Sequence, residues 1–156
     1  MTNPIPAGYH SVTSSLTLKD SLKAIEFYKK AFGAKLLDLF PGLDGKGTMH
    51  ATIQIGDSIL MMGDEGHGCQ SAETLGTSPV SLYIYVPNVD AFFKQAVAAG
   101  ATVTMPVDEM FWGDRAGSLK DPFGYSWMIA THNRELSKEQ MRDGAKAFFA
   151  KMAGKR

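Results

Sequence analysis

The stretch FWGDRAGSLKDPFG, residues 111–124, holds a dense group of side chains that could do chemistry. Asp114 and Arg115 could hold a metal ion, bind a substrate anion through paired hydrogen bonds, or brace a hairpin. Trp112 could stack on a ligand, with Phe111 beside it. Pairing with a nearby acid is the more common fate of such an arginine. Which alternative holds therefore depends on where the surrounding helices and strands place these residues.

Acids and histidines elsewhere offer further candidates. The loop GDEGHG brings Asp64, Glu65 and His67 close together, although a glycine-flanked loop after a strand is commonly a solvated turn. His50 is the histidine that we expect to reach a ligand, either as a hydrogen-bonded wall residue or as a catalytic base. Cys69 has no partner that the sequence places beside it, and nucleophile, phosphate-loop and zinc-finger motifs are absent from the sequence.

Three other polar residues fit structural roles. Asp121 begins the sequence Asp-Pro-Phe-Gly, in which Asp suits the first position of a β-turn, Pro the second and Gly the fourth. His10 lies at the entrance to a strand and His132 at the end of one. We therefore assign Asp121 to a turn and place neither histidine in the predicted site.

Two halves of the chain repeat the same order of elements. Each begins with a β-prone run, residues 12–18 or 80–86, and continues into an amphipathic helix that starts on a capping residue and stops at Gly-Ala. Each half then adds an apolar strand and two strands around a turn. The sequence therefore predicts an α+β fold of two tandem βαβββ modules that form a curved mixed sheet around a cleft. We expect a single domain over residues 1–156, with module one at about 8–65, a connector at 66–79, module two at about 80–133 and a C-terminal helix at about 137–153.

The C-terminal helix is predicted from its start. Ser137 and Gln140 have the spacing of a capping box. The apolar face of the helix, which includes Met141, Phe148 and Phe149, must be covered by this domain or by a second chain.

Composition narrows the class of protein. Sixteen basic and sixteen acidic side chains cancel, so we expect neither nucleic acid nor an anionic membrane as a partner. The single cysteine excludes an intrachain disulfide. The sequence has neither a signal-peptide pattern nor an apolar run of membrane-spanning length. We expect a soluble cytoplasmic protein.

The doubled βαβββ pattern, with Gly-Ala after each helix and DPFG before the last strand, resembles the vicinal oxygen chelate superfamily, which includes glyoxalase I, fosfomycin-resistance proteins, extradiol dioxygenases and bleomycin-resistance proteins. The segments GDSILMMGDE and FWGDRAGSLKDPFGYSWMIATH are similar to its PhnB-like branch. The resemblance implies that each module forms half of a cleft, and that the protein is a homodimer in which modules can be exchanged between chains. For the metal enzymes of the superfamily it implies a divalent ion held by His, Glu or Gln.

Strand alternation assigns side chains to the two faces of each predicted sheet. With the apolar set turned toward the helix, the cleft face carries Thr13, His50, Thr52, Gln54, Ile59, Met61, Ser81, Tyr83, Tyr85 and Met128. We place Trp112 and Arg115 at the cleft mouth, because the loop before the seventh strand reaches over the cleft in this superfamily. An apolar and aromatic wall with a few polar groups is typical of a small-molecule pocket.

The metal-ligand positions of glyoxalase-type enzymes fall, by this resemblance, on Thr13, Met61, Ser81 and Met128. Hydroxyl and thioether groups supply neither the charge nor the strong donor atoms that a divalent ion needs. We therefore predict no conventional metal site and no cofactor. Met61 and Met128 could contact an irregular ligand, or could simply fill space.

These observations favour a metal-independent small-molecule binding protein of the bleomycin-resistance type. The alternative is a glyoxalase- or lyase-like enzyme with an atypical metal site or none, which would use His50, Glu65 or Asp114; a divalent metal would then be its cofactor. An interaction module that works through the last helix is a third class. The residues alone do not distinguish a binding protein from an enzyme.

Overall fold

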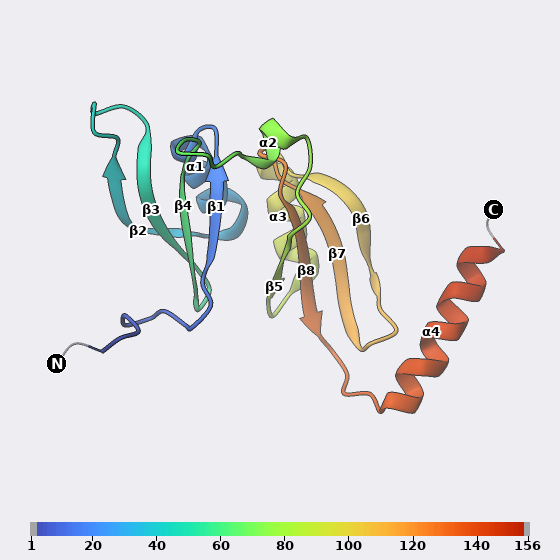
Figure 1. Cartoon of the computed structure of the whole chain (residues 1–156). Helices are drawn as coiled ribbons and strands as arrows, with labels where there is room; N and C mark the ends of the chain where they lie inside the picture. The colour runs from blue at the N-terminus through green and yellow to red at the C-terminus, as the bar shows by residue number, and fades with distance from the viewer. Residues whose placement is uncertain (1–2, 155–156) are drawn as a thin grey trace.

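A computed structural model describes residues 3–154 of the chain (Figure 1). These residues form two four-stranded sheets, and the predicted α+β fold of two tandem βαβββ modules with a C-terminal helix is confirmed. In chain order the elements are β1 (Ser14–Leu18), α1 (Ser21–Phe32), β2 (Lys35–Pro41), β3 (Thr48–Ile55), β4 (Ser58–Asp64), α2 (Ala72–Leu75), β5 (Ser81–Tyr85), α3 (Val89–Ala99), β6 (Thr102–Glu109), β7 (Asp114–Lys120), β8 (Ser126–His132) and α4 (Lys138–Ala153). Within this range no helix has the length and apolar character needed to cross a membrane.

Both sheets have the same strand order. It is β1-β4-β3-β2 in module one and β5-β8-β7-β6 in module two. The first strand of each module runs parallel to the fourth, and the other pairs are antiparallel. Figure 1 shows the sheets side by side, with β1 and β5 at their facing edges. Each of these strands therefore presents an edge with unpaired backbone groups toward the other module.

Helices α1 and α3 begin and end where the sequence predicts. Asp20 caps α1 and Asn88 caps α3, each through a side-chain oxygen that accepts a backbone N–H of the first turn. Gly33 ends α1 with φ 65° and Gly100 ends α3 with φ 120°, backbone conformations that glycine adopts without steric cost.

Aromatic side chains from both modules share one core. Helices α1 and α3 pack against each other, and the rings of Phe32 and Phe92 stack with centroids 5.8 Å apart. Trp127 of β8 lies 4.7 Å from Phe32 and 5.4 Å from Tyr28, between ring centroids. The modules are thus joined on their helix sides, which leaves the opposite face of each sheet open to a ligand or to another chain.

A buried carboxylate also joins the two modules. The Asp121 side chain accepts hydrogen bonds from Tyr28 Oη of α1 at 2.7 Å and from Trp127 Nε1 of β8 at 2.8 Å. It accepts two more from the backbone N–H groups of Phe123 and Tyr125, both at 2.9 Å. Burial raises the pKa of Asp121, and these hydrogen bonds oppose the rise. The predicted turn is present, but the turn alone does not describe this residue: Asp121, the inner carboxylate, connects α1 to module two.

The C-terminal helix stands at the far side of module two in Figure 1. Its predicted capping box is confirmed, with Ser137 Oγ accepting from Gln140 N and the Gln140 side chain accepting from Ser137 N. Phe111 lies 5.7 Å from Phe148 and 6.3 Å from Phe149, between ring centroids. Within α4, however, no side chain is buried. Its apolar face is therefore covered only in part by this domain.

Candidate functional site

The open face of module one, the side of its sheet opposite α1, carries polar side chains. Strand pairing places Met61 between Ser15 and Thr52. His50 Nε2 lies 3.1 Å from Thr52 Oγ1, and Tyr9 Oη lies 3.4 Å from the same oxygen. Thr52 is therefore buried beneath its neighbours, and the ring nitrogen of His50 already has a partner within the chain.

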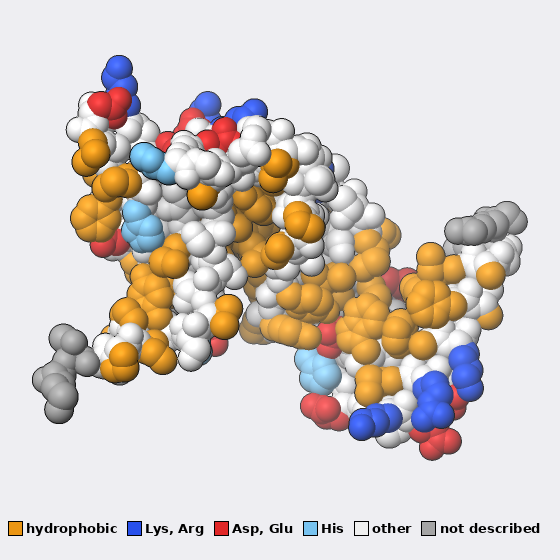
Figure 2. Space-filling view, viewed as in Figure 1, with side chains coloured by type: hydrophobic (Ala, Val, Ile, Leu, Met, Phe, Trp, Pro, Cys, Tyr) orange, Lys and Arg blue, Asp and Glu red, His pale blue; other side chains and the backbone are white. Residues whose placement is uncertain are grey.

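The open face of module two has an apolar floor. Its members are Met105, Met110, Ala116, Met128 and Ala130, a cluster separate from the main core. Trp112 packs against this floor, and Ser118 Oγ donates to Met128 Sδ at 3.3 Å. Hydrophobic side chains gather on this part of the molecule beside α4 (Figure 2). Met105 and Met128 are the partly exposed members of this cluster, so they offer a surface on which the apolar part of a ligand can lie.

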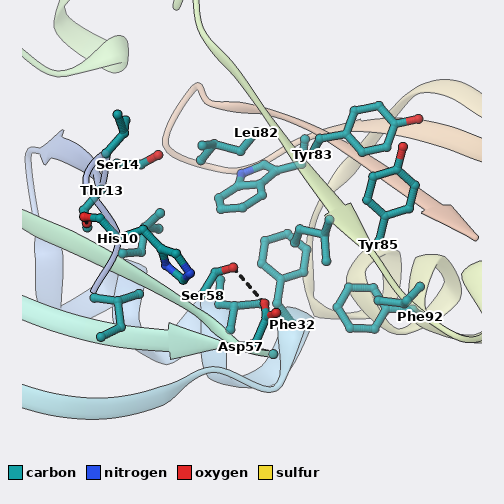
Figure 3. Close-up of a pocket in the computed structure, with 18 of the residues that line it drawn as sticks. His10, Thr13, Ser14, Phe32, Asp57, Ser58, Leu82, Tyr83, Tyr85 and Phe92 are labelled. Atoms are coloured by element: carbon teal, nitrogen blue, oxygen red, sulfur yellow. Dashed lines mark hydrogen bonds between the residues drawn. The ribbon is translucent and has the colours of Figure 1, made fainter. Parts of the chain in front are cut away.

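Asp114 lies at one end of this floor, on β7. Its side chain is 1% exposed, and its Oδ1 lies 2.7 Å from His132 Nδ1. Oδ2 accepts from Trp112 Nε1 at 2.9 Å, from Tyr85 Oη at 3.0 Å and from Tyr83 Oη at 3.1 Å. Figure 3 shows Tyr83 and Tyr85 side by side on β5, and their ring centroids are 4.9 Å apart. Asp114, the outer carboxylate, therefore orients the polar and aromatic side chains of this face.

The protonation of the cluster follows from these contacts. Burial is the largest influence on Asp114 and pushes its pKa upward, but the hydrogen bonds that it accepts together leave the pKa below its ordinary value. Hydrogen bonds to Asp114 first, and to Glu135 second, raise the pKa of His132. Burial, and then the hydrogen bond to Asp114, raises the pKa of Tyr83 and of Tyr85. Asp114 is therefore an ionised carboxylate, and it lies next to the readily protonated imidazole of His132.

His132 is the site residue that the sequence analysis missed. We placed it at a strand end in a structural role, whereas it contacts Asp114 and is 46% exposed through its side chain. Pairing in the β7–β8 hairpin puts Asp114 opposite His132, and the same register pairs Lys120 with Ser126 next to the Asp121 turn. Counting residues outward along both strands from the predicted turn would have placed Asp114 opposite His132.

Arg115 lies on the other side of the sheet. Its Nε and Nη2 donate to both carboxylate oxygens of Asp90 in α3, at 2.9 and 2.7 Å, and Nη1 lies 3.6 Å from Glu109. Adjacent residues of a strand point to opposite faces, so Asp114 and Arg115 cannot share one. The prediction that Arg115 reaches the cleft mouth with Trp112 is therefore wrong, and the arginine has its more common fate, pairing with nearby acids.

A cavity of about 750 Å³ lies between the facing edges of β1 and β5 (Figure 3). The stacked rings of Phe32 and Phe92 line it, and on its rim Ser58 Oγ donates to the Asp57 carboxylate at 2.9 Å. Thr13 lines this cavity, just before β1 begins, and donates to a backbone carbonyl at 3.3 Å. Tyr83 and Tyr85, which contact Asp114, line the same cavity, whereas none of the residues of the apolar floor does. The other predicted cleft residues lie on strands that form the open faces: His50, Thr52, Gln54 and Met61 in module one, and Ser81, Tyr83, Tyr85 and Met128 in module two.

Comparison with known proteins gives the family. Residues 10–129 match the model of the Glyoxalase/Bleomycin resistance protein/Dioxygenase superfamily. The chain belongs to this superfamily. An uncharacterized protein of Mycobacterium tuberculosis is 36% identical to the chain over 137 residues, which cover 85% of the chain and 80% of the relative.

Several solved structures share the fold of this chain. TioX from Micromonospora sp. ML1 superposes with a TM-score of 0.63 at 26% identity, covering 79% of this chain and 98% of TioX. The PhnB protein from Bacillus cereus, a putative 3-demethylubiquinone-9 3-methyltransferase, gives 0.62 at 20% identity over 78% of this chain and 99% of its own. FosX, a fosfomycin resistance protein from Listeria monocytogenes, gives 0.59 at 15% identity over 85% and 97%. At these identities the last two are evidence of the fold alone.

The residues that the resemblance to the superfamily's metal enzymes assigns to ligand positions do not fit a divalent ion. Thr13, Met61, Ser81 and Met128 offer hydroxyl and thioether groups, and the Met128 sulfur already accepts a hydrogen bond from a serine. Across residues 3–154 no three His, Cys, Asp or Glu side chains come together as a metal site would require. Chemistry through a metal therefore has no support from the donor set of the open faces.

The two acids at the end of β4, Asp64 and Glu65, have structural partners instead. Asp64 accepts from the backbone N–H groups of Ser21 and Thr48, both at 2.8 Å. Glu65 accepts from Ser71 N at 2.7 Å, and hydrogen bonds from this region lower its pKa to about 2. Asp64 thus ties the start of α1 and β3 to the end of β4, and Glu65 ties the connector to it, while residues 66–70 of the loop are exposed.

Proposed function

We propose that this member of the superfamily binds a small organic molecule on the open face of module two, and that it does so without the divalent ion used by the superfamily's metal enzymes. The observation that carries the proposal is the apolar floor that ends at the outer carboxylate, Asp114. An apolar surface beside a few fixed polar groups is the usual composition of a ligand site.

Pre-organisation of the polar end supports binding. Asp114 accepts hydrogen bonds from the two tyrosines and from Trp112, so these aromatic side chains are held in one arrangement before a ligand arrives. Side chains that are already ordered lose little conformational entropy on binding, which leaves more of the contact energy for affinity. The methionines of the floor can adapt to the outline of an irregular molecule.

A second copy of the chain completes the site in this proposal. Module one exposes large apolar side chains on and next to its outer strand, namely Leu36, Leu37, Leu39, Phe40 and Met49. Figure 2 shows hydrophobic side chains along this edge of the molecule. Contiguous apolar surface of this kind is typical of an interface between chains. Sedimentation at micromolar concentration tests this part, with a homodimer expected and a monomer contradicting it.

Ligand binding is tested with a matched pair of variants. A collection of apolar and aromatic compounds is screened by ligand-observed NMR against the wild-type protein, Met128→Lys and Met61→Lys. Strand pairing gives the two methionines equivalent places in the two modules. We expect Met128→Lys to lose the compounds that bind and Met61→Lys to retain them. Equal loss in both variants would contradict placement of the site on module two.

Metal uptake is tested separately. The protein is incubated with Zn²⁺, Ni²⁺ or Mn²⁺, dialysed, and analysed for bound metal. We expect much less than one ion per chain, because the superfamily's ligand positions carry hydroxyl and thioether groups here. One ion per chain that is lost in a variant of the open faces would overturn the metal-independent part of the proposal.

A further inference from the structure

We propose that His132 forms an anion-binding subsite at the end of the apolar floor, which takes a carboxylate or a similar oxyanion of the ligand and which Glu135 occupies when no ligand is present. This inference rests on the proposed function, because it names the chemical class that the open face of module two would bind.

The geometry of the imidazole carries the inference. Asp114 engages Nδ1 at 2.7 Å, so the ring is fixed in position and Nδ1 carries a hydrogen. Nε2 points to the opposite side of the ring, where Glu135 Oε1 lies at 3.2 Å. Protonation of Nε2 creates a cationic donor whose direction is set by a buried carboxylate. Such a donor matches an anionic oxygen.

The contact with Glu135 shows that a carboxylate oxygen can lie at Nε2 of His132. Its side chain is 96% exposed, and it belongs to the segment between β8 and α4. An exposed ion pair of this kind contributes little to stability, so little opposes its exchange for another carboxylate. The acid of a ligand lying on the apolar floor would gain the same hydrogen bond and would bury apolar surface as well. Glu135 is thus an internal competitor for the subsite.

The hydrogen-bond directions favour recognition of an acid over proton abstraction from carbon. Removing a proton next to a carbonyl requires donors that stabilise the oxyanion that forms. Tyr83, Tyr85 and Trp112 all direct their hydrogens to Asp114. The two phenol oxygens therefore present lone pairs to a ligand, and suit its N–H or O–H groups. The site matches a molecule with an apolar body, an acidic group and a hydrogen-bond donor.

The charged surroundings set the expected pH dependence. Asp114 and Glu135 face the two nitrogens of His132, and the neighbouring Arg134 and Glu109 pair with each other at 4.0 Å. Contacts with the two acids raise the pKa of His132 above its ordinary value. The affinity for an acidic ligand should therefore be highest at low pH and should fall as pH rises through the pKa of His132.

The test uses 2-naphthoate and its neutral analogue 2-naphthamide as probes, with affinities measured by calorimetry from about pH 6 to about pH 9. We expect the affinity of wild-type protein for 2-naphthoate to fall roughly tenfold over this range, and that for 2-naphthamide to stay constant. His132→Gln should bind 2-naphthoate roughly tenfold more weakly at low pH and without pH dependence. Glu135→Gln should bind it about two- to fivefold more tightly, because the internal competitor is gone.

A control and a direct readout accompany the variants. His67→Gln replaces a histidine outside the site and should behave as wild type. In unaltered protein, the imidazole resonances of His132 followed by NMR should show a higher pKa with 2-naphthoate bound than without it. That measurement needs no variant to fold.

The outcomes separate the inference from the proposed function. Binding of both probes on the apolar floor with equal affinity and no pH dependence would overturn the subsite and leave the proposed function standing. Unchanged affinity for 2-naphthoate in Glu135→Gln would remove the role given to Glu135. Failure of both probes, and of every compound in the screen, to bind on this face would overturn the proposed function itself.

Discussion

Two buried carboxylates flank the same strand and accept similar hydrogen bonds, yet they serve different ends. Asp114 begins β7 and Asp121 follows it. Each accepts from a tryptophan Nε1–H and from at least one tyrosine hydroxyl. The inner carboxylate has buried neighbours, one of which comes from module one. The outer carboxylate has neighbours on an open face, and for one of them, His132, the hydrogen bond to Asp114 raises the pKa above its ordinary value.

The difference teaches that donor number alone does not assign a role to a buried acid. Burial raises the pKa of Asp121, where no cation lies among its hydrogen-bond partners in the described residues. Asp114 keeps a pKa below the ordinary value because the hydrogen bonds that it accepts, the one with His132 foremost, outweigh the effect of burial. A buried carboxylate whose donors are all neutral and enclosed has a structural role. A set that includes an exposed titratable group makes a surface that can respond to a ligand.

The largest effect should come from the inner carboxylate. Asp121→Ala leaves Tyr28 Oη, Trp127 Nε1 and two backbone N–H groups without their acceptor in the core. We expect the free energy of unfolding to fall by about 3–5 kcal/mol. Urea denaturation measures it, with the exposed Asp57→Ala as the control, which should change stability by less than about 0.5 kcal/mol. Equal loss in the two variants would remove the structural role of Asp121.

A smaller loss of stability is expected at the outer carboxylate. In Asp114→Ala the freed donors of Tyr83, Tyr85 and His132 can reach water, so we expect about 1–2 kcal/mol. The pKa of His132 should also return toward its ordinary value of 6.5, since the main cause of its rise is gone. NMR titration of the ring provides this second measurement. A loss as large as that of Asp121→Ala would erase the distinction between the two sites.

The pH dependence of stability should follow the outer site. Because the folded pKa of His132 lies above 6.5, its contribution is fully present below that pH and is lost as pH rises through the folded pKa. Unfolding midpoints in urea should therefore decrease over this window in wild-type protein and stay flatter in His132→Gln. His67→Gln serves as the control. The same slope in both variants would show that another group is responsible.

The smallest change in stability is expected for Arg115, which lies on the side of β7 that faces α3. Arg115→Ala removes the ion pair with Asp90, whose side chain is 58% exposed, so stability should barely change at moderate salt. Ligand affinity should also be unchanged, because Arg115 and the apolar floor lie on opposite faces of the sheet. Calorimetry with a compound from the screen checks this. A clear loss of affinity would restore Arg115 to the site.

Local sequence pattern was sufficient to predict the helices, strands and turns, but not which side chains contact each other in the fold. Capping residues, Gly-Ala stops and strand alternation predicted the βαβββ order, the capping box at Ser137 and the turn at Asp121, because each depends on neighbours in sequence. Alternation also puts the side chains of Asp114 and Arg115 on opposite faces of the sheet. His132 was missed because its partner is reached across a hairpin rather than along the chain.

By itself the sequence determined the family and the tandem modules, since residue type and short-range spacing carry that information. Only the tertiary structure decided what each acid contacts. Tyr28 and Asp121 are far apart in the chain, as are Tyr83 and Asp114, and they meet because strand pairing and helix packing bring them together. The physical reason is that burial and hydrogen-bond partners, which set the role and the pKa of a carboxylate, are properties of the folded surroundings.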